Sequence, residues 1–125
     1  MNYQQLVADL VKHARAWPGP EPLEIPNIPV QQHEDNWLQL VVNPGETLTP
    51  EVGSGPCPRM QGLVIFQIYA QREKGWGAAY DIATRIGNHM AYQSIGDIDT
   101  LAYTPEDFGE IDGWYRVNVN IPYRC

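Results

Sequence analysis

The sequence predicts an α+β protein in which a mostly antiparallel sheet of about four to five strands carries two helices on one face. Apolar residues recur at the 3.6-residue period of amphipathic helices near the start and in the middle of the chain. Residues 114–123 instead alternate between apolar and polar side chains, as a half-exposed antiparallel strand requires. The length of 125 residues is typical of one domain, so we expect residues 1–125 to form a single unit.

The first predicted element is an amphipathic helix at the start of the chain. Asn2 can cap this helix, and Pro18 helps to end it. Residues 18–35 then hold five prolines, which exclude a central strand and favour an extended edge segment around 23–30. The apolar face of the helix is formed by Tyr3, Leu6, Val7, Leu10, Val11 and Ala14.

Two central strands and a long loop are predicted next. The first strand covers residues 37–42 and ends at an Asn-Pro-Gly turn sequence. Residues 44–59 are rich in proline and glycine, which predicts a long loop between the central strands. The second strand, 60–71, is almost continuously apolar over 63–69. We therefore expect both of its faces to be buried, one by a helix and the other by a further strand layer or another subunit.

The second half of the chain predicts a helix over residues 75–92, followed by a short strand at 98–103. Residues 104–113 are acidic, end in Asp-Gly and predict a turn region. The strand at 114–123 closes the chain, with its apolar side chains on one face and its polar side chains on the other.

Acidic and basic residues are segregated along the chain. The net charge is −7, from 15 acidic and 8 basic residues, which argues against a surface that binds DNA or an anionic membrane. Residues 18–58 and 94–113 each hold six acidic residues and no Lys or Arg, so the remainder carries +5. Solvated acidic loops explain this pattern, and so does a bipolar subunit that stacks or closes a ring electrostatically.

Motifs for chemistry are sparse, so we predict a protein that is not an enzyme and needs no metal or cofactor. No glycine-rich nucleotide-binding motif is present. The cluster His33, Glu34 and Asp35 lacks a second ligand pair, and Cys57 with a histidine makes an unspecific dyad. A small metal-dependent or cysteine hydrolase that uses these residues stays open as an alternative. No apolar run reaches the roughly 20 residues that cross a membrane, and we expect no membrane association.

The order and spacing of several segments carry a further signal. Together they resemble the small tail terminator, or tail completion, proteins of long-tailed bacteriophages. The strand–glycine–helix unit at 62–90 and the closing Ile-Pro-Tyr-Arg are the most telling of these segments. The full set is Ala-Trp-Pro at 16–18, the strand at 37–42, Gly-Glu-Thr at 45–47, the strand at 61–69, Glu-Lys-Gly-Trp-Gly at 73–77 with the alanines that follow, and the strand at 113–124.

The resemblance implies a virion protein at the head–tail junction that is assembled in the host cytoplasm. It would form a homo-oligomeric ring, usually a hexamer, which caps the head-proximal end of the tail tube and stops tube polymerisation. Its other partner would be a head-completion or connector protein, and DNA would pass through the lumen without sequence-specific binding. The family has no catalytic residues and needs no cofactor. Another head–tail connector or stopper component stays open as an alternative.

A ring needs two different complementary surfaces on each subunit. Segregated charge and exposed sheet edges can supply them. We place the contacts in the long loop, around the start of the second helix and in the last strand. The expected interface residues are Glu46, Thr47, Leu48, Glu51, Arg59, Arg72, Lys74, Trp76 and Arg116.

Overall fold

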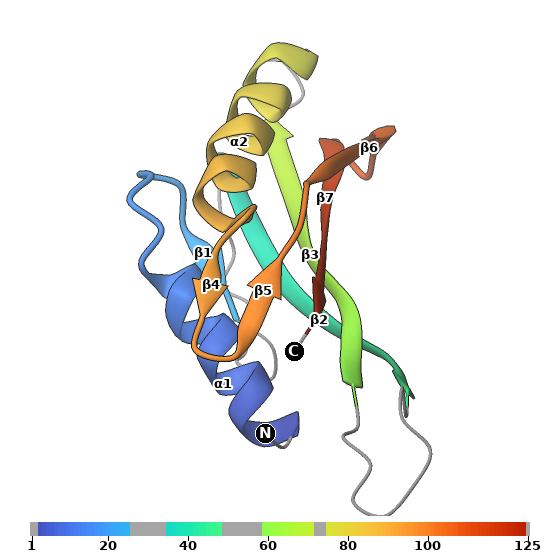
Figure 1. Cartoon of the computed structure of the whole chain (residues 1–125). Helices are drawn as coiled ribbons and strands as arrows, with labels where there is room; N and C mark the ends of the chain where they lie inside the picture. The colour runs from blue at the N-terminus through green and yellow to red at the C-terminus, as the bar shows by residue number, and fades with distance from the viewer. Residues whose placement is uncertain (1–2, 26–34, 49–58, 72–74, 125) are drawn as a thin grey trace, which may run out of the picture.

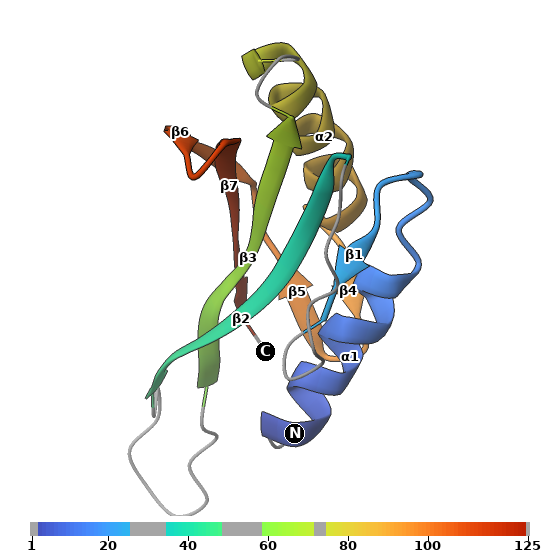
Figure 2. The ribbon, with the colours of Figure 1, turned by 180° about the vertical axis from the view of Figure 1, so that it is seen from behind.

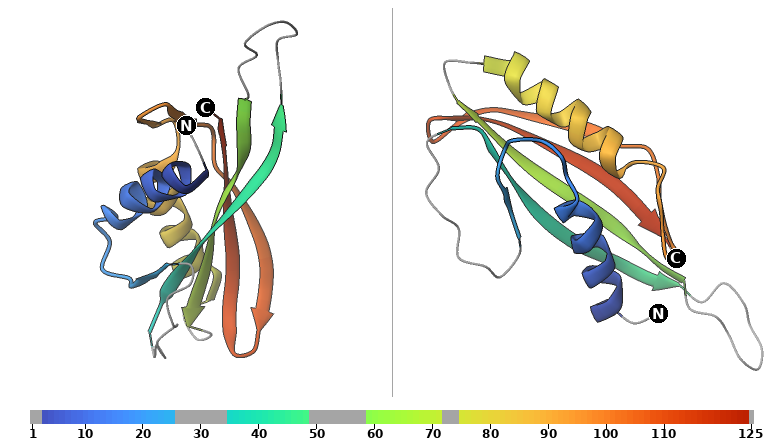
Figure 3. Two further views of the ribbon diagram at one scale, coloured as in Figure 1. Left: turned by 90° about the horizontal axis from the view of Figure 1, so that it is seen from below. Right: turned by 90° about the vertical axis from the view of Figure 1, so that its left-hand side faces the viewer.

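The computed structural model describes residues 3–25, 35–48, 59–71 and 75–124. Two helices, α1 (Tyr3–Arg15) and α2 (Gly75–Met90), lie on the same face of a curved sheet (Figures 1 and 3). The predicted α+β class with both helices on one face is therefore confirmed. Capping of α1 by Asn2 lies outside the described residues.

The sheet has seven strands in the order β1-β2-β3-β7-β5-β4, with β6 also paired to β7, so the prediction of four to five strands was too low. β7 pairs with β3 along its length, and its other edge is shared between β6 and β5. The β1–β2 pair is parallel and the other pairs are antiparallel. The strands are β1 (Leu23–Glu24), β2 (Trp37–Leu48), β3 (Arg59–Gln71), β4 (Ser94–Ile95), β5 (Ile98–Thr100), β6 (Thr104–Ile111) and β7 (Trp114–Arg124).

Two sequence predictions about loops were wrong. The loop predicted over 44–59 is shorter, because β2 continues to Leu48 through a register shift between Pro44 and Thr47, and β3 already begins at Arg59. A bulge of this kind accommodates a proline inside a strand. The remainder of that loop lies outside the described residues.

The acidic segment 104–113 is not a turn region but contains strand β6 and the hairpin turn that leads into β7. An edge strand tolerates these residues, because its side chains are exposed and Pro105 does not interrupt an inner ladder. The strand predicted over 98–103 is also shorter and ends at Thr100. Within the expected edge segment at 23–30, only Leu23 and Glu24 are described as a strand.

The hydrophobic core lies between the two helices and the sheet. Every second residue from Val64 to Ala70 of β3 and from Val117 to Tyr123 of β7 is fully or almost fully buried, on the face that the helices cover. The alternation predicted for the last strand is thus confirmed. The core side chains are Leu6, Leu10 and Ala14 of α1, Leu38 and Leu40 of β2, Val64, Phe66, Ile68 and Ala70 of β3, Ala79, Ile82, Ala83, Ile86 and Met90 of α2, Ile98 of β5, and Val117, Val119, Ile121 and Tyr123 of β7.

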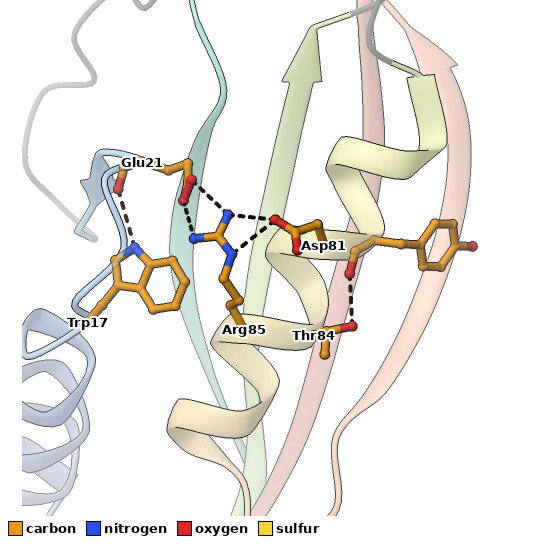
Figure 4. A network of polar contacts seen from close by, with 6 residues as sticks. Trp17, Glu21, Asp81, Thr84 and Arg85 are labelled. Carbon is orange, nitrogen blue, oxygen red and sulfur yellow. Dashed lines mark hydrogen bonds and ion pairs between the residues drawn. The ribbon is translucent and has the colours of Figure 1, made fainter.

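Polar contacts hold the chain that follows α1 against α2 (Figure 4). The Arg85 guanidinium donates to both carboxylate oxygens of Glu21, at 2.7 and 2.9 Å, and also pairs with Asp81 at 3.0 Å. Trp17 donates its indole N–H to the Glu21 carbonyl at 3.3 Å, and the Arg85 guanidinium lies 5.4 Å from the Trp17 ring centroid. A bidentate, charge-assisted pair of this kind fixes orientation as well as distance.

The C-terminal ends of the two helices meet through two histidines. The rings of His13 and His89 stack with centroids 4.7 Å apart. The Nε2 atom of each ring lies 3.1 or 2.8 Å from the carbonyl oxygen of the other residue. Because a carbonyl only accepts, both Nε2 atoms donate, and each histidine satisfies a terminal carbonyl of the opposite helix.

Candidate functional site

The most distinctive surface of the molecule is the face of the sheet opposite the helices. Figure 3 shows both helices on one side of the sheet, and Figure 2 shows β2 and β3 from the other side, where no described segment covers them. We call this surface the helix-free face. It consists of Trp37, Gln39, Val41 and Asn43 of β2, Gln61, Leu63, Ile65, Gln67, Tyr69 and Gln71 of β3, and Trp114, Arg116, Asn118, Asn120, Pro122 and Arg124 of β7.

The strand registers arrange these side chains in rows across the sheet. Tyr69 is paired with Trp37 on one side and with Arg116 on the other. The next row along the strands is made of Gln39, Gln67 and Asn118, and Val41, Ile65 and Asn120 form the row after it. Directly paired residues project on the same face and interact, so each row forms a continuous strip.

The first row is an aromatic strip that includes one cation. The Trp37 and Tyr69 rings stack with centroids 4.1 Å apart and an angle of 6° between their planes. The Arg116 guanidinium lies 4.5 Å from the Tyr69 ring centroid, within the range of a cation–π contact. Trp114, which pairs with Gln71 in the adjacent row, meets Tyr69 edge-on with ring centroids 6.4 Å apart. We call these four residues the aromatic row.

The apolar β3 side chains on the helix-free face are only partly buried. Leu63, Ile65 and Tyr69 are partly exposed, whereas the alternate residues of β3 are buried beneath the helices. Of the two covers predicted for this strand, the helices supply one, and no further strand layer covers the other face among the described residues; cover by another subunit stays a prediction. The β3 sequence is suited to a two-sided environment of which this chain supplies one side.

Two polar atoms on this face are buried without a hydrogen-bond partner among the described residues. They are Nε of Arg116 and Oδ1 of Asn118. A buried polar atom left unpaired costs about 1–3 kcal/mol, and such groups are uncommon in native structures.

The charge of the helix-free face is opposite to that of the whole protein. Its β2, β3 and β7 side chains include two arginines, Arg116 and Arg124, and no carboxylate. Glu106 of the neighbouring β6 borders this face and accepts a hydrogen bond from the Asn120 side chain at 3.1 Å. The complete chain carries −7. The surface therefore combines aromatic rings, amides and positive charge, and it is suited to contact an acidic partner surface.

The β6–β7 hairpin, at the edge of the same sheet, is acidic. Its acidic residues are Glu106, Asp107, Glu110 and Asp112. The apolar side chains of Phe108 and Ile111 are 45% and 37% exposed.

Asp107 attaches this hairpin to α2 and to β7. Its Oδ2 atom accepts hydrogen bonds from the hydroxyls of Tyr115 at 2.7 Å and Tyr80 at 2.9 Å, and its Oδ1 atom accepts from the Gly109 amide at 2.7 Å. These bonds lower the pKa of Asp107, the Tyr115 hydroxyl contributing most. The same carboxylate raises the pKa of Tyr115 to about 12. The role of Asp107 is therefore to position the hairpin.

The predicted interface residues are distributed unevenly over the structure. Arg116 lies on the helix-free face, and Trp76 is 68% exposed in the first turn of α2. In the backbone ladder, Leu48 of β2 pairs with Arg59 of β3. Glu46 and Thr47 also belong to β2, although nothing is described of the side chains of 46–48 and 59, while Glu51, Arg72 and Lys74 lie outside the described residues.

Sequence reasoning missed most of the aromatic row and the amides beside it. Tyr69 and Trp37 come from different strands, and only the register shows that they share a row with Arg116. The alternation of 114–123 did place Arg116 and Asn118 on the polar face of the last strand. That pattern was the available signal for part of this surface.

Of the residues suggested for a hydrolase site, only Asp35 belongs to the described part of the chain. His33, Glu34 and Cys57 lie outside the described residues. Asp35 is exposed, and its Oδ1 atom accepts from the Asn36 amide at 2.8 Å. The described segments contain no group of three or more His, Cys, Asp or Glu placed to hold a metal ion. Neither described helix has the length and apolar character needed to span a membrane.

These features define an α+β protein with a one-sided helical layer and an uncovered sheet face. No family model and no curated protein matches its sequence. Its fold is similar to that of a solved structure known by a sequence identifier in place of a descriptive name, with a TM-score of 0.73 and 15% identity over 99% of this chain and 95% of that one. At this identity the similarity shows the fold alone.

Proposed function

We propose that this protein is a tail terminator of a long-tailed bacteriophage. Its copies form a hexameric ring that caps the head-proximal end of the tail tube and stops tube polymerisation. The ring joins the tube to a head-completion or connector protein and lets DNA pass through its lumen. The protein acts as a structural component of the virion at the head–tail junction and performs no catalysis.

The helix-free face is the observation that supports an assembly role most directly. It leaves Leu63, Ile65 and Tyr69 partly exposed and two buried polar atoms unpaired among the described residues. Exposed apolar patches rimmed by polar groups mark contact surfaces between proteins. A subunit whose sheet is completed by a neighbour agrees with the near-continuous apolarity of residues 63–69.

The sheet edges provide a second argument for assembly into a ring. β6 is paired through one edge only in the described residues, and β1 covers β2 at Leu38 and Gln39 alone. Unpaired strand edges favour addition of another chain. The two edges differ in sequence and charge, as the head-to-tail contacts of a closed ring require.

Deletion of the gene from the phage that encodes it tests the proposal. We expect tails of abnormal length or tails without heads, visible by electron microscopy, and recovery of normal particles when the wild-type gene is supplied in trans. Normal, head-joined tails in the deletion mutant would contradict the proposed function.

Location within the particle separates a terminator from another connector component. A gold or antibody label on the subunit should mark the last ring of the tail tube in tails that have not yet joined a head. A label present only on isolated heads would instead indicate a component of the head connector. For the hydrolase alternative, the tests are stoichiometric metal in the purified protein and loss of an activity in Cys57→Ala.

A further inference from the structure

Arg116 occupies an unusual position for the only cation of the aromatic row. Its guanidinium contacts the Tyr69 ring, and its Nε atom is buried without a hydrogen-bond partner. None of the described carboxylates forms an ion pair with it. A guanidinium has five N–H donors, so one that contacts an aromatic ring can still bind a carboxylate through two parallel hydrogen bonds.

We infer that the helix-free face receives the acidic β6–β7 hairpin of a second copy of this chain, and that Arg116 binds an incoming carboxylate of that hairpin. This inference rests on the proposed function only in requiring that copies assemble. The proposed contact joins the aromatic row of one subunit to residues 104–113 of its neighbour.

Charge complementarity supports this occupant. The β2, β3 and β7 side chains of the helix-free face include two arginines and no carboxylate, whereas the hairpin carries four acidic residues and no basic residue. Of these, Asp112 is exposed, whereas the Glu106 carboxylate accepts a hydrogen bond from the Asn120 side chain at 3.1 Å and Asp107 is engaged by Tyr80 and Tyr115. The hairpin also presents Phe108, which is 45% exposed and is an apolar counterpart for the aromatic row.

The sheet register makes the contact compatible with a closed ring. Trp37, Tyr69 and Arg116 lie in one cross-strand row, and Arg116 is paired in turn with Gly109 of β6. The hairpin is therefore at the same level along the strands as this row, next to its Arg116 end, while the Trp37 end lies on β2. Rotation about an axis parallel to the strands brings one toward the other without a shift along that axis, which is the condition for cyclic closure.

Nucleic acid is the competing occupant, because aromatic side chains and arginine on a sheet face also stack with bases. Two arginines are few for a surface that must neutralise several phosphates, and the net charge of −7 opposes the approach of a polyanion. The second copy is therefore the occupant that the charges favour.

Photo-crosslinking provides the first test and depends little on fold stability. Tyr69 is replaced by p-benzoylphenylalanine, and the purified protein is mixed with an isotopically labelled wild-type copy before irradiation. We expect crosslinked peptides that join position 69 of one copy to residues 104–113 of the other. The matched control places the same photo-reactive residue at Tyr92, an exposed tyrosine just after α2, where no such crosslink is expected.

A charge reversal provides the second test. Arg116→Glu should weaken self-association, measured by sedimentation velocity, by at least about 30-fold, the loss typical of an unpaired interfacial charge. Arg15→Glu makes the same change in net charge at an exposed position on α1 and should leave association unchanged. Phe108→Ser changes the other side of the contact and should also weaken association, and circular dichroism verifies that each variant is folded.

The outcomes separate this inference from the proposed function. Crosslinks from position 69 to other segments, or a chain that stays monomeric in concentrated solution, would overturn the inference. If the deletion phage nevertheless made aberrant tails, the terminator function would stand without this contact. If the hairpin crosslinks formed but the deletion phage made normal tails, the contact would stand and the terminator function would fail. Binding of single-stranded DNA that Arg116→Glu abolishes, with association unchanged, would assign the face to nucleic acid.

Discussion

Replacing Val119 by aspartate is a strong test of how the sheet is oriented. Val119 is fully buried in the middle of β7, paired with Phe66 of β3 and facing the helices. Val119→Asp should destabilise the protein severely, because it places a carboxyl group in the hydrophobic core.

The expected magnitude follows from two contributions. Loss of the buried valine side chain costs about 2 kcal/mol. At pH 7, about three units above the ordinary pKa of an aspartate, keeping the buried carboxyl protonated costs about 4 kcal/mol. The total of about 6 kcal/mol is comparable to the entire free energy of unfolding of a small domain, about 5–15 kcal/mol.

The second contribution depends on pH, and its sign is fixed. Burial raises the folded-state pKa of the introduced carboxyl above its unfolded value, so the penalty grows as pH rises and shrinks as pH falls. Between pH 7 and pH 5 the variant should recover about 2.7 kcal/mol relative to wild type. Urea unfolding followed by circular dichroism at both pH values measures this difference.

The matched control is Val119→Asn, because asparagine has a shape similar to that of aspartate and does not titrate. It should lose stability to a similar extent at both pH values. If Val119→Asp unfolded within about 1 kcal/mol of wild type, or if the asparagine variant had the same pH dependence, the assignment of this face of β7 to the core would be refuted.

Three further predictions concern the segments around the core. Asp107→Asn should release the hairpin and speed hydrogen exchange of the Gly109 amide; in the wild type, the stabilisation by this carboxylate should be present above its unfolded pKa and lost as pH falls through its lowered folded value. Glu21→Gln should lower the thermal midpoint, because it weakens the bidentate pair with the α2 arginine, whereas Asp81→Asn, at a 67% exposed side chain, should have a smaller effect. Replacing residues 49–58 by a short glycine-containing turn should leave the far-ultraviolet circular dichroism intact and impair assembly in sedimentation, and loss of folding would show that this segment belongs to the core.

The elements with a clear hydrophobic period could be predicted from the sequence. The period of α1 brought Leu6, Leu10 and Ala14 to one face, and these three residues are fully buried in the core. Val117, Val119 and Ile121 followed from the alternation of the last strand in the same way. In both elements the burial of one face determines the spacing of the apolar residues, so the local sequence is sufficient to predict the element and its buried side.

Strands that depend on their neighbours were harder to predict. β6 contains a proline, a glycine and three acidic residues, which is the composition of a turn, yet it pairs with β7 because that edge is otherwise open. β2 continues past Pro44 because a bulge absorbs the irregular residues. Both outcomes are set by tertiary pairing, which overrides local propensity.

The uncovered face of β3 is the most informative feature for function. Its near-continuous apolar run predicts cover on two faces, and the helices cover only the face of Val64, Phe66 and Ile68. The other face carries Tyr69 in an aromatic row with a cation whose Nε atom has no partner among the described residues. The apolar run of β3 is longer than packing against the helices requires. The folding of the isolated chain therefore does not by itself explain why this strand is apolar on both faces. The proposed assembly with a second copy would supply the missing cover and would give the acidic hairpin a partner surface.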